Sequence, residues 1–293
     1  MKFSKMHSLG NDYIFINRFE EEIENPRELA RILSHRRFGI GSDGLLLVEP
    51  SMKALFKMRM FNADGSEAEM CGNGLRCFGK YVYEQHLTQE TNFWVETGAG
   101  LRHIELEVKN GEVVCIQADM GKPILERSKI PMLGKAGPVL DEVFSIQEHI
   151  FQVSAISMGN PHLVIFVEQL AQFPVHYWGP LLEKDFRFPH GVNVEFAERQ
   201  TSSCVFQRTW ERGCGETYAC GTGACAVSVA SMLQGRCDSS VDIHLRGGVL
   251  KVVWDQKNSV FLSGPASWIY EGTISANWLQ KMNFIPQDEL FLC

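Results

Sequence analysis

The sequence predicts an α+β fold of two similar halves, each with strands around one central helix. The first observation behind this is an internal repeat. The segment CGNG at 71–74 returns as CGTG at 220–223, and SLGN at 8–11 returns as SMGN at 157–160, a spacing of 149 residues in both cases. The second is a helical pattern directly after each of the two cysteine segments. Halves of about 150 residues also fit a chain of 293 residues as two domains.

Three helices are expected in chain order. The first begins at Asn25-Pro26, because Asn caps helix N-termini and Pro suits the first helical position. In the second, apolar residues recur at helical spacing through 75–87. The third covers a small, apolar stretch after Cys220, ends before Gly235, and is expected to be the more buried of the two. Each repeated cysteine therefore stands at the N-terminus of a helix.

Strands are expected over most of the rest. Apolar alternation and β-branched residues mark them, and Asn110-Gly111 predicts a hairpin turn. The expected strands are 13–16, 45–48, 55–61, 93–97, 101–108, 112–119, 162–167, 191–196, 203–210, 241–245 and 249–254. The repeat places the first half at residues 1–118, joined by 270–293, and the second half at 119–269.

Charge and composition narrow the function. The chain has 28 basic and 35 acidic residues, a net charge of −7, so no nucleic-acid partner is expected. Its apolar runs are strand-length, and its start lacks an unbroken apolar stretch, so neither a membrane span nor a signal peptide is expected. Nine cysteines without a CxxC pair predict a cytosolic protein with reduced, mostly buried thiols and no metal site.

The repeated cysteines suit acid–base chemistry. Backbone N–H groups and the dipole at a helix N-terminus favour a thiolate, so we expect the pKa of both thiols to fall toward neutrality. The flanking glycines let the backbone approach a bound carboxylate. Two such motifs suggest a single site that inverts a stereocentre, with a base on one face of a carbon and an acid on the other.

Other interpretations of Cys71 and Cys220 stay open. They are two structural thiols, a regulatory disulfide, or part of a non-catalytic metabolite-binding or redox module. A Cys–His hydrolase that uses His162 leaves the second cysteine unexplained. Metal binding with Cys77 or Cys225 is disfavoured, because neither spacing is a usual ligand pattern.

A GxGxxG pattern at 39–44 does not predict a dinucleotide site, since a strand pattern rather than a helix follows it.

Several segments together resemble the diaminopimelate epimerase family, from residue 1 to about 273. They are GND-Y at 10–13, FNADGSEAEMCGNGLRC at 61–77, GNPH at 159–162, GVNVEF at 191–196, RTWERGCGETYACGTGACA at 208–226, LRGG at 245–248 and SGPA at 263–266. The resemblance implies two pseudo-symmetric α/β domains, each a strongly curved, antiparallel-rich sheet wrapped around a central helix. It implies a cofactor-independent epimerase that converts LL-2,6-diaminopimelate to the meso form, for lysine and peptidoglycan precursor synthesis. It also implies a cytoplasmic homodimer.

The resemblance assigns roles by position. Cys71 is the base toward the LL substrate and Cys220 the proton donor, while His162 and Glu211 tune the two thiols. The implied substrate-binding residues are Asn11, Asn62, Gly72, Asn73, Asn160, Asn193, Glu211, Arg212, Gly221 and Thr222. Arg212 is the bidentate partner expected for the distal carboxylate. Another amino-acid racemase, acting on proline derivatives or histidine, is the alternative enzyme, but Arg212 and the asparagines favour a substrate with a second charged end.

The chain departs from the family pattern in three places. Gly44 stands where some members carry Gln, so no side chain contacts the substrate there. Cys214 replaces a commonly apolar residue, and we interpret it as a core or near-site thiol. The segment after Thr273 is longer than the family needs, and its role is not assigned beyond padding the first domain or an interface.

Overall fold

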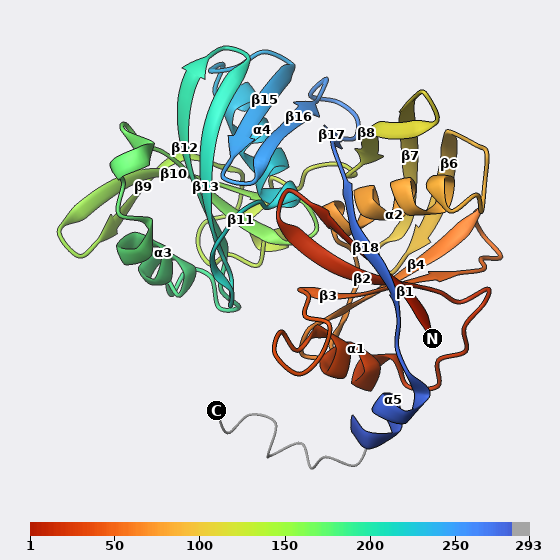
Figure 1. Cartoon of the computed structure of the whole chain (residues 1–293). Coiled ribbons are helices and arrows are strands. Elements are labelled where there is room, and N and C mark those ends of the chain that lie inside the picture. The colour runs from red at the N-terminus through yellow and green to blue at the C-terminus, as the bar shows by residue number, and fades with distance from the viewer. Residues whose placement is uncertain (283–293) are drawn as a thin grey trace. The chain divides into compact units, whose positions relative to one another are not determined.

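Two helices of equal length follow the two repeated cysteines. In the computed structural model, which describes residues 1–282, α2 spans Gly72–Glu84 and α4 spans Gly221–Leu233 (Figure 1). Both ends of the two helices keep the spacing of 149 residues. Eleven of the thirteen residues of α4 are buried, against ten of the thirteen in α2, so α4 is the more buried by a narrow margin.

Contacts divide the chain into two units. Unit 1 is Met1–Leu101 with the segment from Ala266 on, and unit 2 is Arg102–Pro265. The pair β7–β8 belongs with unit 2 because β8 is hydrogen-bonded to β17. The boundaries at 118 and 269 that the repeat suggests stay a prediction.

The sheet of unit 1 runs β18–β1–β2–β3–β4–β6, with the short β5 paired to β4. The pairs β2–β3 and β4–β6 are parallel, and the others are antiparallel. Helix α2 packs on β1, β3 and β4. The elements are β1 (Lys2–Ser8), β2 (Asn11–Asn17), α1 (Pro26–Ser34), β3 (Gly44–Glu49), β4 (Phe56–Asn62), β5 (Glu67–Ala68), α2, β6 (Asn92–Thr97), β18 (Ser267–Thr273) and α5 (Ala276–Met282).

The sheet of unit 2 runs β9–β10–β11–β12–β13–β15–β16–β17–β8–β7, with β14 paired to β13. Helix α4 packs on β10, β11, β12, β15 and β16. The elements are β7 (Gly100–Lys109), β8 (Glu112–Asp119), β9 (Val139–Ile146), β10 (His149–Ser157), β11 (Pro161–Phe166), α3 (Val175–Glu183), β12 (Asn193–Thr201), β13 (Cys204–Glu211), β14 (Gly215–Thr217), α4, β15 (Ser240–Leu245), β16 (Gly248–Val253) and β17 (Phe261–Gly264), with 3-10 turns at Arg127–Lys129 and Leu170–Gln172.

The pairing pattern repeats between the units. In unit 2, β11–β12 and β13–β15 are parallel, and β10–β11, β12–β13 and β13–β14 are antiparallel. These match β2–β3, β4–β6, β1–β2, β3–β4 and β4–β5 in unit 1. Helices α1 and α3 follow the same 149-residue spacing at both ends. The predicted pseudo-symmetric α+β fold, with a sheet around one central helix in each half, is confirmed.

Local signals in the sequence explain several element ends. Asn25 caps α1 by accepting a hydrogen bond from the Glu28 N–H. Asn110 and Gly111 both have positive φ, as a type I′ hairpin turn requires, and join β7 to β8. Gly235, with φ of 66°, follows the C-terminus of α4. The segment at 39–44 leads into β3 rather than a helix.

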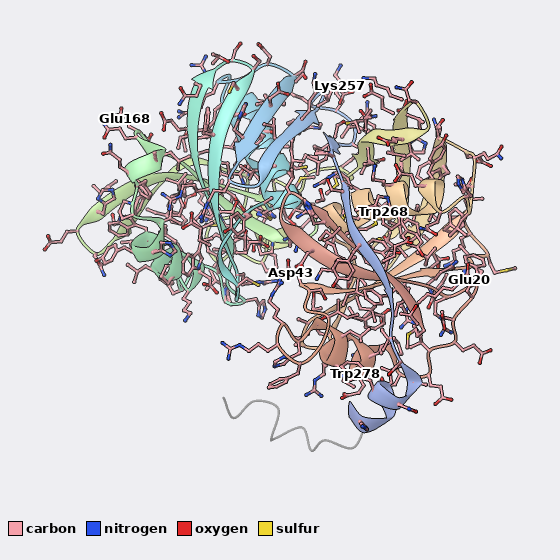
Figure 2. All side chains as sticks on the ribbon, in the orientation of Figure 1. Glu20, Asp43, Glu168, Lys257, Trp268 and Trp278 are labelled. Carbon is pink, nitrogen blue, oxygen red and sulfur yellow. The ribbon has the colours of Figure 1, made fainter. Side chains whose placement is uncertain are left out.

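Helix α3 and seven strands were not predicted from the sequence, namely β1, β5, β9, β10, β14, β17 and β18. Helix α3 contains Pro180. Because proline disfavours a helix interior, residue propensities do not predict this helix. The hairpin β9–β10 has exposed positions along much of β9, so its apolar alternation is weak. The tail forms the short helix α5, whose Trp278 and Leu279 pack on the unit 1 core beside α1, where Figure 2 shows Trp278; residues 283–293 lie outside the described residues. Through Met282, the tail therefore pads the first unit.

Within residues 1–282, no helix has the length and apolar character needed to cross a bilayer.

Candidate active site

Cys71 and Cys220 have the same backbone setting. Each is the N-cap residue of its helix in an extended conformation, and its sulfur accepts a hydrogen bond from the backbone N–H three residues later. The distance is 3.4 Å both for Gly74 N to Cys71 Sγ and for Gly223 N to Cys220 Sγ. The sequence-based placement of both cysteines at helix N-termini is confirmed. Gly72 and Gly221 open the two helices, so their backbone N–H groups are among those without an intrahelical acceptor.

Cys71 lies in a network of polar side chains. The hydroxyl of buried Tyr13 on β2 lies 2.8 Å from Cys71 Sγ and also bonds Asn11 Oδ1. Asn73 Nδ2 donates to the same Asn11 oxygen at 3.1 Å. The structure thus brings together two of the expected substrate-binding residues, Asn11 and Asn73, around the first sulfur. Tyr13 was missed from the sequence.

The surroundings of Cys220 are charged. Burial and the carboxylates of Glu211 and Glu195 raise the pKa of Cys220 well above 9, although Thr222 and the Gly223 N–H act in the opposite direction. Our expectation that the helix N-terminus lowers the pKa of both thiols is therefore wrong for Cys220, because desolvation outweighs the N–H groups. At neutral pH this residue is a thiol. The Thr222 hydroxyl lies 3.5 Å from its sulfur.

Glu195 lies close to Cys220 and bonds three other side chains. It is fully buried on β12 and pairs with His162 Nδ1 at 2.8 Å. Its other oxygen accepts from Gln207 Nε2 at 2.7 Å and Thr209 Oγ1 at 2.6 Å. The imidazole of His162 lies between two oxygen acceptors, because its Nε2 faces Asn160 Oδ1, 3.0 Å away.

Sequence reasoning missed Glu195 too. A signal was present: it is the one charged residue in the apolar strand segment GVNVEF.

The remaining predicted binding residues are held by local contacts. Asn193 bridges Pro161 O and the Arg212 N–H at 2.9 and 3.0 Å. Arg212 is exposed, and its Nη1 donates to His190 O. Glu211 accepts from the Thr217 hydroxyl at 2.5 Å.

In unit 1, Asn62 bonds Ser66 in the β4–β5 turn rather than the Tyr13 network.

The departures from the family pattern have structural outcomes. Gly44 pairs with Asn62 across β3–β4, and a Cβ on it would lie 2.4 Å from Phe61 O, so this backbone excludes a larger residue there. Cys214 is exposed in the β13–β14 turn, two residues from Arg212, so it is not a core thiol. Of the eight cysteines described, three are buried, which makes the expectation of mostly buried thiols wrong.

One set of side chains has metal-ligand chemistry among the described residues. The ligand atoms of His162, Glu195 and Cys220 all lie within 4.8 Å of one another, and all three residues are buried. Imidazole, carboxylate and thiolate are donors that Zn²⁺ accepts. Two of these three residues are already bonded to each other, through His162 Nδ1 and Glu195 Oε1 at 2.8 Å.

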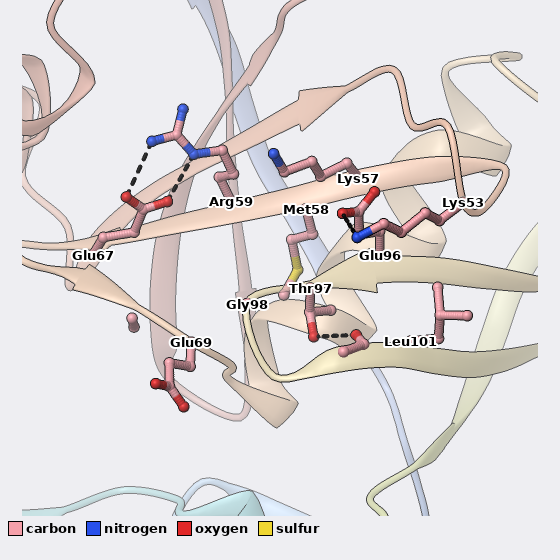
Figure 3. Close-up of a pocket in the computed structure, with 12 residues that line it drawn as sticks. Lys53, Lys57, Met58, Arg59, Glu67, Glu69, Glu96, Thr97, Gly98 and Leu101 are labelled. Atoms are coloured by element: carbon pink, nitrogen blue, oxygen red, sulfur yellow. Dashed lines mark hydrogen bonds and ion pairs between the residues drawn. The ribbon is translucent and has the colours of Figure 1, made fainter.

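An arginine–glutamate ion pair links the two strands of the hairpin that precedes each cysteine. Arg59 binds Glu67 through two contacts of 2.7 and 3.1 Å, and Arg208 binds Glu216 through two of 2.7 and 3.0 Å. These are the repeat-related glutamates, four residues before their cysteines. Figure 3 shows the first pair at the edge of a cavity of about 600 Å³.

Glu216 should contribute to stability in a pH-dependent way. Burial raises its pKa, but the bonds from Arg208 and the charges of Arg246 and His176 outweigh this and hold the pKa below 4.5. A depressed pKa gives stability that is present above pH 4.5 and is lost as the pH falls through the folded-state value. We expect Glu216→Gln to lower the unfolding free energy at pH 7 by roughly 1–3 kcal/mol.

Urea denaturation at several pH values checks this. The deficit of Glu216→Gln should shrink below pH 4.5. Glu67→Gln is the matched control: its side chain is 33% exposed against 1% for Glu216, so its effect should be smaller. Equal effects of the two variants, or a deficit that does not change with pH, would contradict the burial argument.

The paired glycines offer a second prediction. A Cβ on Gly223 would lie 2.5 Å from Glu195 Oε1, whereas the tightest contact of one on Gly74 would be Leu46 Cδ1, at 3.1 Å. We expect Gly223→Ala to lower stability by about 1–3 kcal/mol, because a buried, fully bonded carboxylate must move. Gly74→Ala should cost less, since a leucine methyl group can rotate away. Thermal unfolding of the two variants measures the difference, and a larger loss in Gly74→Ala would rule this explanation out.

Known proteins resemble the chain over nearly its full length. The family model of diaminopimelate epimerase matches residues 3–126 and 154–269. A diaminopimelate epimerase of Methanococcus maripaludis is 49% identical over 94% of this chain and 99% of its own. One from Acetivibrio thermocellus is 48% identical over 95% and 100%. Among solved structures, a probable proline racemase from Agrobacterium radiobacter has a TM-score of 0.71 at 14% identity, covering 94% of this chain and 93% of its own, and shares the fold.

Proposed function

Because the chain belongs to the diaminopimelate epimerase family and is therefore an isomerase, we propose that it converts LL-2,6-diaminopimelate to the meso form with Cys71 and Cys220 as its acid–base pair. The observation that carries the proposal is the equivalence of the two sulfurs: each caps a helix and accepts the same backbone N–H bond. The proposal requires that one substrate carbon meets a base on one face and an acid on the other.

The reaction balances with protons alone. The Cys71 thiolate takes the α-proton of the LL substrate as the C–H bond breaks, and the Cys220 thiol gives its proton to the opposite face. The thiol form of Cys220, which burial and two carboxylates favour, suits the donor role. The N–H groups at the starts of α2 and α4 are suited to the reacting carboxylate as it becomes enolate-like. No cofactor is required by this sequence of steps.

The second unit supplies the charged groups that a two-ended substrate needs. Glu211 and Arg212 stand where unit 1 has Asn62 and Ala63, at the repeat spacing. In the proposal Arg212 binds the distal carboxylate, while Asn11, Asn62, Asn160 and Asn193 hold the amine and carboxylate groups. In the proposal, His162 and Glu211 tune the thiol of Cys220.

Deuterium exchange tests the function. In deuterated water, pure LL-diaminopimelate should give meso product that carries deuterium at the inverted carbon, read by mass spectrometry and chiral chromatography. A panel with proline, hydroxyproline and histidine tests the alternative, because a hydroxyproline epimerase from Agrobacterium vitis shares the fold with a TM-score of 0.65. Turnover of a monocarboxylic amino acid without turnover of diaminopimelate would overturn the assignment.

We also propose that the enzyme works as a cytoplasmic homodimer in lysine and peptidoglycan precursor synthesis. The family membership supports this. Analytical ultracentrifugation at micromolar concentration would contradict the dimer if it gave a single species of 33.1 kDa.

A further inference from the structure

The hydroxyl of Tyr13 is in contact with one of the two repeated sulfurs. It lies 2.8 Å from Cys71 Sγ, on a side chain that is 1% exposed. It contacts Asn11 Oδ1 as well, so one hydroxyl proton has two acceptors to choose from. Asn73 Nδ2 also donates to that Asn11 oxygen, which therefore keeps a partner when the hydroxyl turns toward the sulfur.

The two units have diverged at this place. The repeat partner of Tyr13 is His162, and each bonds the asparagine two residues before it. The residue beneath the helix start is Leu46 in unit 1, where a Cβ on Gly74 would meet it, and Glu195 in unit 2, where a Cβ on Gly223 would meet it. At these equivalent positions unit 1 thus has a phenol and an apolar side chain, while unit 2 has an imidazole and a carboxylate.

These partners favour opposite protonation states of the two sulfurs. A hydroxyl that donates to a thiolate makes a charge-assisted bond, which is about twice as strong as its bond to a neutral acceptor. A thiol in the same place is only a weak donor. Buried carboxylates act the other way, because they repel a second negative charge.

We propose that Tyr13 is a positioning residue that donates its hydroxyl proton to the Cys71 thiolate, so that the resting enzyme holds its base on Cys71 and its acid on Cys220. The inference deepens the proposed function, on which its catalytic meaning rests. Burial and the neighbouring Cys71 raise the pKa of Tyr13 well above 10, so the phenol keeps its proton to donate.

Other charged and titratable groups face this network from α2 and from the segment before β3. Arg76 on α2 donates to Asn73 Oδ1 and Gly72 O. Asp43 accepts from Asn11 Nδ2 and is paired with Arg36. The Cys77 thiol lies along α2, and burial raises its pKa. All of these stay in place when the Tyr13 hydroxyl is removed, so a change in Cys71 reports on that hydroxyl.

Alkylation by iodoacetamide as a function of pH tests the proposal without substrate. The tryptic peptide of residues 60–76 contains Cys71 as its one cysteine, so mass spectrometry gives its rate directly. In Tyr13→Phe, the midpoint pH of Cys71 alkylation should rise by about one unit, because a hydrogen bond to a charged group is lost. Tyr81→Phe, the same change at another buried tyrosine of unit 1, should leave the midpoint unchanged.

A second substitution moves the midpoint in the opposite direction. Placing 3-fluorotyrosine at position 13 keeps the side chain but makes its hydroxyl a stronger donor, so the Cys71 midpoint should fall. A merely structural role of Tyr13 predicts no shift in either variant. An unchanged Cys71 midpoint in both, measured on folded protein, would overturn the proposal.

The catalytic role of Tyr13 predicts a separate kinetic result. For the LL-to-meso direction, the acidic limb of the pH profile of kcat/KM should move up in Tyr13→Phe with the alkylation midpoint, whereas the meso-to-LL direction, in which Cys220 is the base, should keep its limb. If the midpoint shifts but diaminopimelate is not turned over, the proposed function fails and the role of Tyr13 stands. If diaminopimelate is turned over and the midpoint does not shift, the proposed function stands and the role of Tyr13 fails.

Discussion

Cys71→Ala and Cys220→Ala should each abolish epimerisation, with kcat reduced by about 10³-fold or more. The physical reason is that inversion needs a proton removed from one face of the carbon and another delivered to the opposite face. One sulfur alone removes and returns a proton on its own face. Each variant should therefore still exchange an α-proton with the solvent without inverting the carbon. The two variants should do so with different isomers of the substrate.

The retained exchange identifies which sulfur serves which face. In deuterated water, Cys220→Ala should still exchange the α-proton of LL-diaminopimelate through Cys71. Cys71→Ala should instead exchange the α-proton at the D-centre of the meso form. Proton NMR of recovered substrate and chiral chromatography of product measure both reactions.

Two other cysteines provide matched controls. Cys77 on α2 and Cys225 on α4 are buried in the same two helices, a little beyond the helix starts. Their alanine variants remove a thiol without touching an N-cap sulfur, so both should epimerise. Full activity in Cys71→Ala or Cys220→Ala, or exchange of the same isomer by both, would refute the two-sulfur mechanism.

The repeat made most of the fold predictable from the sequence. The spacing that joins Cys71 to Cys220 also joins α1 to α3, so it would have located α3 over Val175–Glu183 despite Pro180. Strands with apolar alternation were found because one face of each is buried. The hairpin β9–β10 was not, since its burial depends on which strands lie beside it rather than on its own pattern.

The N-cap positions of Cys71 and Cys220 were predictable because capping is a local property of the chain. Tyr13 and Glu195 were not, because their importance comes from contacts with residues 58 and 33 positions away along the sequence. Tyr13 sits in an apolar strand segment, where an aromatic side chain is typical of the core, and the single charge of Glu195 in such a segment does not identify its partners. The pKa direction of Cys220 was wrong for the same reason: burial by distant strands and two carboxylates outweighs the local helix start.

The second large prediction concerns Glu195, and it covers both the stability of the protein and the pKa of Cys220. Glu195→Ala removes the carboxylate that His162, Gln207 and Thr209 share in a fully buried site, and Gln207 keeps another acceptor, Thr209 Oγ1. Breaking a buried charged network in this way should lower the unfolding free energy by about 3–5 kcal/mol. Glu195→Gln keeps the volume and one acceptor oxygen, so its loss should be smaller.

The glutamine variant isolates the effect of charge. Glu195 is one of two carboxylates that, with burial, raise the pKa of Cys220. Removing one negative charge should lower that pKa, so the midpoint pH of Cys220 alkylation should fall, opposite to the expected change of Cys71 in Tyr13→Phe. Fragmentation mass spectrometry of the 213–236 peptide separates Cys220 from its two neighbouring cysteines. Glu198→Gln, on the same strand, is the control and should leave the midpoint unchanged. If Glu195 already held a proton, the substitution would remove no charge, so a Cys220 midpoint that does not fall in Glu195→Gln would contradict the role of this carboxylate in raising the pKa of Cys220.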